Sequence, residues 1–189
     1  LFMIGAGGHA ASIENCILEN EKRISGLILK SIKEDTLVKN KYDIYAEETV
    51  HTSLNKKVIF LINGIGMLPY CNLRDNIWKK FIDKGFRFIG LSAKSSYISP
   101  TADISPSAQI LHGSIVNCFA SIGDNTIINT NATIEHHSQI GQSCHIAPGA
   151  VVCGHCSIGD NVFIGANATI SHCTQIASGT VVKAGAVVW

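Results

Sequence analysis

An isoleucine or valine recurs at every sixth position from Ile98 to Val188, without a single insertion. The residue four positions after each of these is small or β-branched, as at Ala102, Ser114 and Cys144. A small residue and the next Ile or Val lie two apart, so both point to the same face of a short strand. A six-residue repeat of this kind is typical of a parallel β-helix, in which three hexapeptides form one triangular coil. The spacing therefore predicts about five stacked coils over 98–188.

The first 92 residues predict a separate, small α/β domain of Rossmann-like type. Short apolar strands are expected at 1–4, 26–29, 58–62 and 86–91, and helices at about 11–20 and 73–84. Strands that alternate with helices imply a parallel sheet. The polar stretch Ser92–Ser96 predicts the boundary, which gives domains of residues 1–92 and 93–189.

A glycine-rich loop follows the first expected strand. Its sequence, Gly5-Ala-Gly-Gly-His-Ala10, fits the pattern that lets a backbone approach a phosphate at a helix N-terminus. A dinucleotide cofactor would need an acidic residue at the tip of the second strand, where the sequence reads Leu29-Lys30-Ser31. No nicotinamide cofactor is therefore expected, and the loop is either a phosphate contact or only a tight turn.

Composition excludes several classes of protein. A formal net charge of +1 provides no basic surface for nucleic acid. No apolar run reaches the roughly 18 residues that a membrane-spanning helix needs. Seven cysteines without a signal-peptide pattern favour reduced thiols in a cytoplasmic protein.

Four histidines of the repeat gather at one corner of the predicted coil. Because one coil takes 18 residues, His136 shares a column with Gly154 and His172, and His137 shares one with His155. Both columns lie at turns, so their side chains are expected to point outward. An isolated turn histidine is ordinarily a solvated surface residue, but this clustering favours a functional site.

Metal ligation and redox chemistry are the rival interpretations of this corner. His136 and His172 have the two-coil separation of the zinc ligands in gamma-class carbonic anhydrases, but Ala177 stands where the third ligand is expected. No metal is therefore expected.

The Cys153-Gly-His-Cys156 motif matches C-x-x-C, yet Cys156 occupies an inward-facing position of the repeat. Core packing is expected there rather than redox chemistry.

The order of the domains and four motifs resemble the NeuD/PglD-type family of bacterial sugar acyltransferases. The motifs are Ile4-Gly-Ala-Gly-Gly-His-Ala10, Ile62-Asn-Gly-Ile-Gly66, the INTNATIEHH run of 128–137 and the GQSCHIAPGA run of 141–150. The resemblance covers essentially the whole chain. It implies that the coil is left-handed, that acetyl-CoA is the acyl donor and that the protein is a homotrimer.

The resemblance also implies catalytic roles. His136 would be the general base, because imidazole exchanges protons near neutral pH. The Gly154 N–H would donate to the oxyanion that forms on the thioester, in agreement with the column arithmetic. His137 stands where the family places an Asp or Glu that orients the base, and Glu135 is an alternative for that role.

Further residues are implied to bind the two substrates. His145 matches a family residue that contacts acetyl-CoA, and backbone near Ala166 and Ala184 would line the pantetheine groove. The nucleotide-sugar cradle would comprise Gly7, Gly8, His9 and Gly64. Arg74 is a further substrate candidate, with an exposed helix cation as the alternative. The family's acidic tip on the second strand is absent here, since Lys30 occupies that tip.

The sequence thus predicts an acetyl-CoA-dependent acetyltransferase that acts on an amino sugar, with a nucleotide-linked 4-amino sugar as the expected acceptor, in bacterial surface-glycan biosynthesis. O-acetylation of a sialic-acid-like sugar is the enzymatic alternative. The non-enzymatic alternative is a trimeric scaffold with a ligand-sensing domain.

Overall fold

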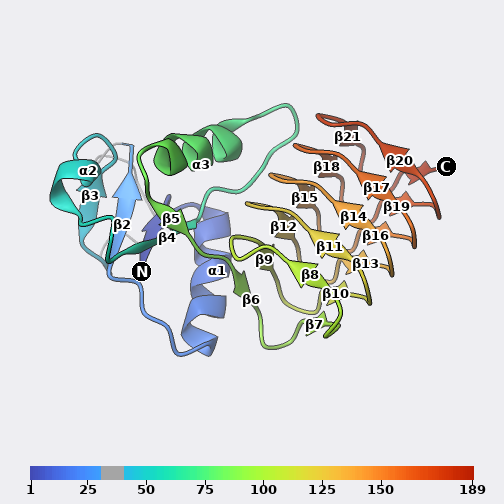
Figure 1. Ribbon diagram of the computed structural model, residues 1–189, viewed down its shortest axis with the longest axis horizontal. Coiled ribbons are helices and arrows are strands. Elements are labelled where there is room, and N and C mark those ends of the chain that lie inside the picture. The colour runs from blue at the N-terminus through green and yellow to red at the C-terminus, as the bar shows by residue number, and fades with distance from the viewer. Residues whose placement is uncertain (31–40) are drawn as a thin grey trace. The chain divides into compact units, whose positions relative to one another are not determined.

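The computed structural model describes residues 1–30 and 41–189, which form two compact units (Figure 1). The first, here called the α/β unit, comprises 1–66 and 73–89. The second, the coil unit, comprises 67–72 and 90–189. Among the described residues, no helix is long and apolar enough to cross a membrane.

The α/β unit contains a five-stranded parallel sheet in the order β3-β2-β1-β4-β5. Its strands are β1 (Phe2–Ile4), β2 (Gly26–Leu29), β3 (Ile44–Ala46), β4 (Phe60–Asn63) and β5 (Arg87–Phe88). Its helices are α1 (Gly8–Glu19), α2 (Val50–Ser53) and α3 (Leu73–Asp83). The expected parallel α/β architecture is confirmed, although the short elements β3 and α2 were not predicted.

The prediction of a single strand over 86–91 is wrong. The segment instead supplies β5 to the α/β unit and β6 (Leu91–Ser92) to the coil unit. The change of partner occurs within two residues, because the Ile89 N–H donates to Leu61 O at 2.9 Å and the Gly90 N–H donates to Pro106 O at 2.6 Å. A Cβ at Gly90 would lie only 1.6 Å from Ala108 O, so only glycine fits against this neighbouring backbone.

The coil unit consists of two-residue strands that repeat every six residues and stack as triangular coils (Figure 1). They form three parallel sheets of six, five and six strands. Partners lie 18 residues apart, as when Ile134 pairs with Val116 and Val152. After β6 the strands are β7 (Tyr97–Ile98), β8 (Asp103–Ile104), β9 (Gln109–Ile110), β10 (Ile115–Val116), β11 (Ser121–Ile122), β12 (Ile127–Ile128), β13 (Thr133–Ile134), β14 (Gln139–Ile140), β15 (His145–Ile146), β16 (Val151–Val152), β17 (Ser157–Ile158), β18 (Phe163–Ile164), β19 (Thr169–Ile170), β20 (Gln175–Ile176), β21 (Val181–Val182) and β22 (Val187–Val188).

The repeat positions fill the inside of the coil, as the spacing predicts. All sixteen Ile and Val positions from Ile98 to Val188 belong to one hydrophobic cluster or pack against it. Each fully buried Ile or Val contributes roughly 1.5–3 kcal/mol to stability. The turns require left-handed backbone, with φ near +57° at Asn125 and +62° at His137. Asparagine tolerates this conformation better than most residues, which explains its recurrence at the turns.

Candidate active site at a corner of the coil

Three histidines meet at one corner of the coil unit, as the 18-residue columns predict. His136 and His137 lie in the turn between β13 and β14, and His155 lies one coil further on, where its N–H donates to His136 O at 3.0 Å. The rings of His137 and His155 are stacked, with centroids 4.7 Å apart and 13° between their planes. The ring of His136 is nearly perpendicular to both, at 5.3 and 5.2 Å. We call His136, His137 and His155 the histidine corner.

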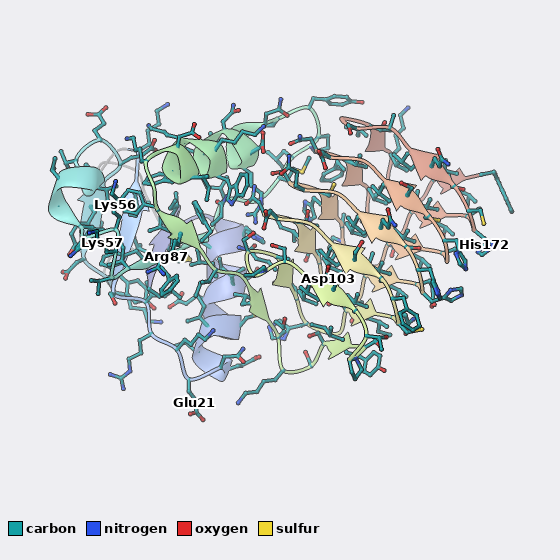
Figure 2. The ribbon with its side chains drawn as sticks, in the orientation of Figure 1. Glu21, Lys56, Lys57, Arg87, Asp103 and His172 are labelled. Carbon is teal, nitrogen blue, oxygen red and sulfur yellow. The ribbon has the colours of Figure 1, made fainter. Side chains whose placement is uncertain are left out.

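His172 extends this corner by one more coil. Its ring lies edge-on to that of His155, with centroids 5.4 Å apart. Figure 2 labels His172 at the outer edge of the coil, where its side chain points away from the coil. His172 therefore projects outward, as expected for a turn position.

The ring of His136 is held in one orientation by two neighbours. Its Nδ1 lies 3.2 Å from Nδ1 of His137, so one ring donates to the other. The ring also packs directly on Gly154, where a Cβ would approach His136 Cε1 to 2.7 Å and Nε2 to 2.9 Å. Only glycine leaves room for this ring. If His136 donates from Nδ1, its Nε2 carries the lone pair that can accept a proton.

The Gly154 backbone has an N–H outside the hydrogen-bond ladder of the coil. At this corner the ladder uses the His155 N–H and the Cys173 N–H, the latter donating to Gly154 O at 3.0 Å. Within the described residues, the ladder does not use the Gly154 N–H. The structure therefore brings a base and a candidate oxyanion donor side by side.

No carboxylate orients His136 within the described part of the chain. Glu135 Oε2 accepts from Asn117 Nδ2 at 2.9 Å, so its side chain serves the neighbouring coil. His137 supplies the contact instead, and its ring is also packed on Phe119 at 5.0 Å. Partial burial lowers the pKa of His155, and positive charge on the neighbouring histidines lowers it further. The His155 ring is therefore harder to protonate than an isolated histidine.

His145 is buried on the outer face of β15, where Met67 covers it, rather than at the histidine corner. Its Nδ1 lies 3.1 Å from Met67 O, and its Nε2 lies 2.9 Å from Asn129 Nδ2. These partners place the ring proton on Nδ1, because a carbonyl can only accept and the amide NH₂ donates. Sequence reasoning missed both partners. Met67 is 78 residues away, so no spacing in the sequence indicates that contact.

Ala166 and Ala184 stack on neighbouring coils at a different corner. The Gly185 N–H donates to Ala166 O at 2.8 Å, which joins the two turns. Ala166 is half-buried and Ala184 is exposed, so their backbone is open to a ligand. This corner follows the sheet that contains His145, and the sheet of β13, β16 and β19 separates it from the histidine corner. In one chain, Ala166 and Ala184 thus lie at a different corner from the expected base, whereas Gly154, also expected to contact acetyl-CoA, lies beside it.

The glycine loop of the α/β unit begins α1, with Gly7 as the N-cap. A Cβ at Gly7 or Gly8 would have nothing within 4 Å, so the backbone here is open to a ligand. A Cβ at Gly64 would instead lie 2.7 Å from Ile4 O, which gives this residue a packing role. His9 packs near Gly66, whose Cβ would approach His9 Cβ to 3.2 Å. Of the tip Leu29-Lys30-Ser31, Ser31 lies outside the described residues.

Arg74 is buried, so its interpretation as an exposed helix cation is wrong. Only 2% of the residue is exposed. Its Nη1 donates to the carbonyls of Asn63 and Ile65, on either side of Gly64, and Asn63 Nδ2 donates back to Arg74 O at 3.3 Å. Burial lowers the pKa of the Arg74 guanidinium to about 9, which leaves it charged at neutral pH. Arg74 therefore anchors the Gly64 loop.

Replacing this anchor is expected to destabilise the protein. Arg74→Met should lower the free energy of unfolding by about 3 kcal/mol, because two buried carbonyls lose a charged donor. Denaturant titration with circular dichroism detection measures the change. Arg23→Met, at an exposed position, is the control and should stay within about 0.5 kcal/mol of the wild type. Equal stability of the two variants would contradict the anchoring role.

The cysteines carry no disulfide. All seven are free, and Cys156 of the C-x-x-C motif is buried. Its Sγ donates to Ser171 O at 3.0 Å, and burial raises the pKa of its thiol. The expectation that Cys156 is a core residue is confirmed.

The chain is similar to known proteins in sequence and in fold. The family model described as bacterial transferase hexapeptide (six repeats) matches residues 119–154, 137–172 and 155–188. PerB from Caulobacter crescentus, solved with CoA and GDP-perosamine, is 25% identical over 100% of this chain and 87% of that chain, with a TM-score of 0.89. The acetyltransferase domain of PglB from Neisseria gonorrhoeae, solved with acetyl coenzyme A, is 22% identical over 99% and 91%, with a TM-score of 0.85. WeeI from Acinetobacter baumannii is 18% identical over 98% and 94%, with a TM-score of 0.76.

These similarities confirm the expected fold class, an α/β region followed by a left-handed parallel β-helix of hexapeptide repeats. The family model matches residues 119–188, and the whole chain has the fold of the NeuD/PglD-type sugar acyltransferases that its sequence resembles.

Proposed function

We propose that this protein transfers the acetyl group of acetyl-CoA to the amino group of an amino sugar. The observation that carries the proposal is the packing of the His136 ring on Gly154, which pairs a base with a backbone donor. The structures of PerB with CoA and GDP-perosamine, and of PglB with acetyl-CoA, support the same donor and class of acceptor.

In the proposed reaction His136 acts as the general base. Its Nε2 takes a proton from the amine as the amine nitrogen attacks the thioester carbon. The Gly154 N–H donates to the carbonyl oxygen as that oxygen becomes negative. The C–S bond then breaks, and the proton held by His136 passes to the sulfur of CoA. No covalent bond to the protein forms, so the acceleration of the reaction comes from positioning the substrates and from proton transfer.

His137 positions the base in this proposal. By accepting from His136 Nδ1, it keeps the lone pair of His136 on Nε2. A neutral imidazole stabilises the imidazolium less than a carboxylate does, because it carries no opposite charge. His137 therefore mainly determines the tautomer and the orientation of His136, and it affects the basicity of His136 less.

The acetyl-CoA groove is proposed to lie between subunits of a homotrimer. Ala166 and Ala184 would line it, but they lie at a different corner from His136 in the same chain. A single acetyl-CoA molecule could reach Ala166 and Ala184 of one subunit and His136 of another if these two corners face each other in the trimer. His145 would support this groove by holding Met67 and Asn129 in place, since both of its ring nitrogens already have partners.

The acceptor is proposed to be a nucleotide-linked 4-amino sugar for bacterial surface-glycan biosynthesis, bound by the α/β unit. The open backbone of Gly7 and Gly8 at the N-terminus of α1 suits a phosphate. His9 and Gly64 belong to the same proposed cradle, with Gly64 shaping it through packing. The domains 1–92 and 93–189 would thus divide acceptor binding from acetyl transfer. The free thiols fit a cytoplasmic location.

A thiol-release assay tests this function directly. Purified protein is incubated with acetyl-CoA and a panel of UDP-, GDP- and CMP-linked sugars, each amino sugar being matched with its hydroxyl counterpart. We expect CoA release above the hydrolysis rate only with amine acceptors. Release with hydroxyl acceptors would indicate O-acetylation instead. If acetyl-CoA neither reacts nor raises the melting temperature, the proposal fails in favour of a scaffold.

A further inference from the structure

We propose that the histidine corner is a binding site for a divalent transition-metal ion such as Zn²⁺, and that the ion and acetyl transfer exclude each other. The ion is thus an inhibitor at the catalytic base and not a cofactor. Metal binding follows from the corner itself, whereas the inhibitory effect rests on the function proposed above.

The geometry of the three rings carries this inference. One ligand nitrogen from each of His136, His137 and His155 lies within 4.8 Å of the other two. Two imidazole nitrogens at 2.0–2.1 Å from a tetrahedral zinc ion lie about 3.3 Å apart. The two Nδ1 atoms of His136 and His137 are already 3.2 Å apart. Three protein ligands leave the fourth position to water.

A small rotation completes the site. Because the rings of His137 and His155 are nearly parallel, one of them must turn about its Cβ–Cγ bond to aim its lone pair at a shared ion. Both side chains are exposed, so solvent provides the room for this turn. His155 is the freer of the two, because the ring of His137 is also packed on Phe119.

The repeat that carries the corner has few positive charges. The sequence has no Lys or Arg from Ser95 to Val182, whereas it has four acidic residues there, namely Asp103, Asp124, Glu135 and Asp160. No lysine or arginine side chain between residues 95 and 182 therefore repels the ion. The ligand set is imidazole, which suits zinc, copper and nickel.

An ion at this site removes the base whichever nitrogen of His136 it takes. If the ion binds Nε2, it uses the lone pair that would accept the proton. If it binds Nδ1, the proton of the neutral ring must move to Nε2, which then has no lone pair to offer. Acetyl transfer and metal occupancy therefore compete for the same ring.

Cobalt binding tests the site without any assay of activity. Co²⁺ is titrated into the full-length protein, and the visible d–d bands of a four-coordinate ion are followed, with Zn²⁺ as competitor. We expect saturation at one ion per chain. His155→Asn should weaken the affinity at least tenfold, because it removes one ligand, and asparagine tolerates the left-handed backbone of that position, where φ is +58°.

His172→Asn is the matched control, because it removes a histidine that touches His155 but lies outside the site. Its cobalt affinity should stay within threefold of the wild type. Unchanged affinity in His155→Asn would overturn the metal site. A strong thiolate-to-cobalt charge-transfer band would also overturn it, since cysteine rather than histidine would then be the ligand.

The inhibitory effect is measured separately, as acetyl transfer with Zn²⁺ relative to the rate of the same variant in EDTA. The zinc concentration for half-inhibition should rise at least tenfold in His155→Asn. Full activity at saturating zinc would overturn the exclusion while leaving the site intact. Histidine-dependent cobalt binding in a protein that acetylates no acceptor would keep the site and refute only the proposed function.

Discussion

Replacing His136 by alanine is expected to lower kcat for acetyl transfer by about 10²- to 10⁴-fold, the usual contribution of general-base catalysis. The amine then has no group to take its proton as it attacks the thioester. The coil should be unaffected, because the His136 ring lies at a turn and outside the hydrophobic cluster. Steady-state rates with saturating acetyl-CoA, and with an acceptor found in the thiol-release assay, measure the loss.

Two further measurements separate a lost base from a lost fold. The shift in melting temperature caused by acetyl-CoA should remain in His136→Ala, since Ala166 and Ala184, which are proposed to line the CoA groove, lie at another corner. His172→Ala, which changes the same turn position two coils further on, should keep the wild-type rate. A His136→Ala variant with more than a tenth of the wild-type kcat would show that His136 is not the base.

The coil and its corner could be predicted from spacing because one backbone interaction repeats without a break. Each strand pairs with residues 18 positions away, as when Gln139 pairs with Ser121 and Ser157. An unbroken period of six therefore fixes which residues become neighbours. The same arithmetic placed His136 against Gly154 before any contact was known.

The beginning of the coil could not be predicted in the same way. Ser92 stands where the repeat would have Ile or Val, so the pattern starts visibly only at Ile98. The structure nevertheless pairs Ser92 with Ile110, and Gly90 provides the close approach to the coil. The backbone pairing of the coil therefore begins one repeat before the Ile/Val pattern becomes visible.

The burial of Arg74 was missed for a different reason. A cation near the start of a helix is ordinarily exposed, because burying an unpaired charge is costly. Here the carbonyls of Asn63, the last residue of β4, and of Ile65 accept its hydrogen bonds. The need for a donor at these carbonyls depends on the packing of α3 beside β4. A sequence pattern within either element alone does not contain that information.

Replacing Gly154 by alanine is expected to lower kcat by about 10²-fold without unfolding the coil. The added methyl group would lie 2.7 Å from His136 Cε1, so the ring must move away from the position from which it takes the proton. A displacement of about 1 Å at a reacting group is enough for a loss of this size. Circular dichroism and the melting temperature, which should be nearly unchanged, check that the fold is intact.

A double-mutant cycle shows whether the methyl group acts through the ring. In the His136→Ala background the methyl group has no ring to displace, so Gly154→Ala should then cost less than threefold, and the two losses should be far from additive. A full 10²-fold loss in both backgrounds would mean that alanine damages the backbone donor itself. The Gly154 N–H would then contribute to kcat independently of the orientation of the His136 ring. Strong non-additivity would instead show that glycine is needed at position 154 because the base lies directly on it.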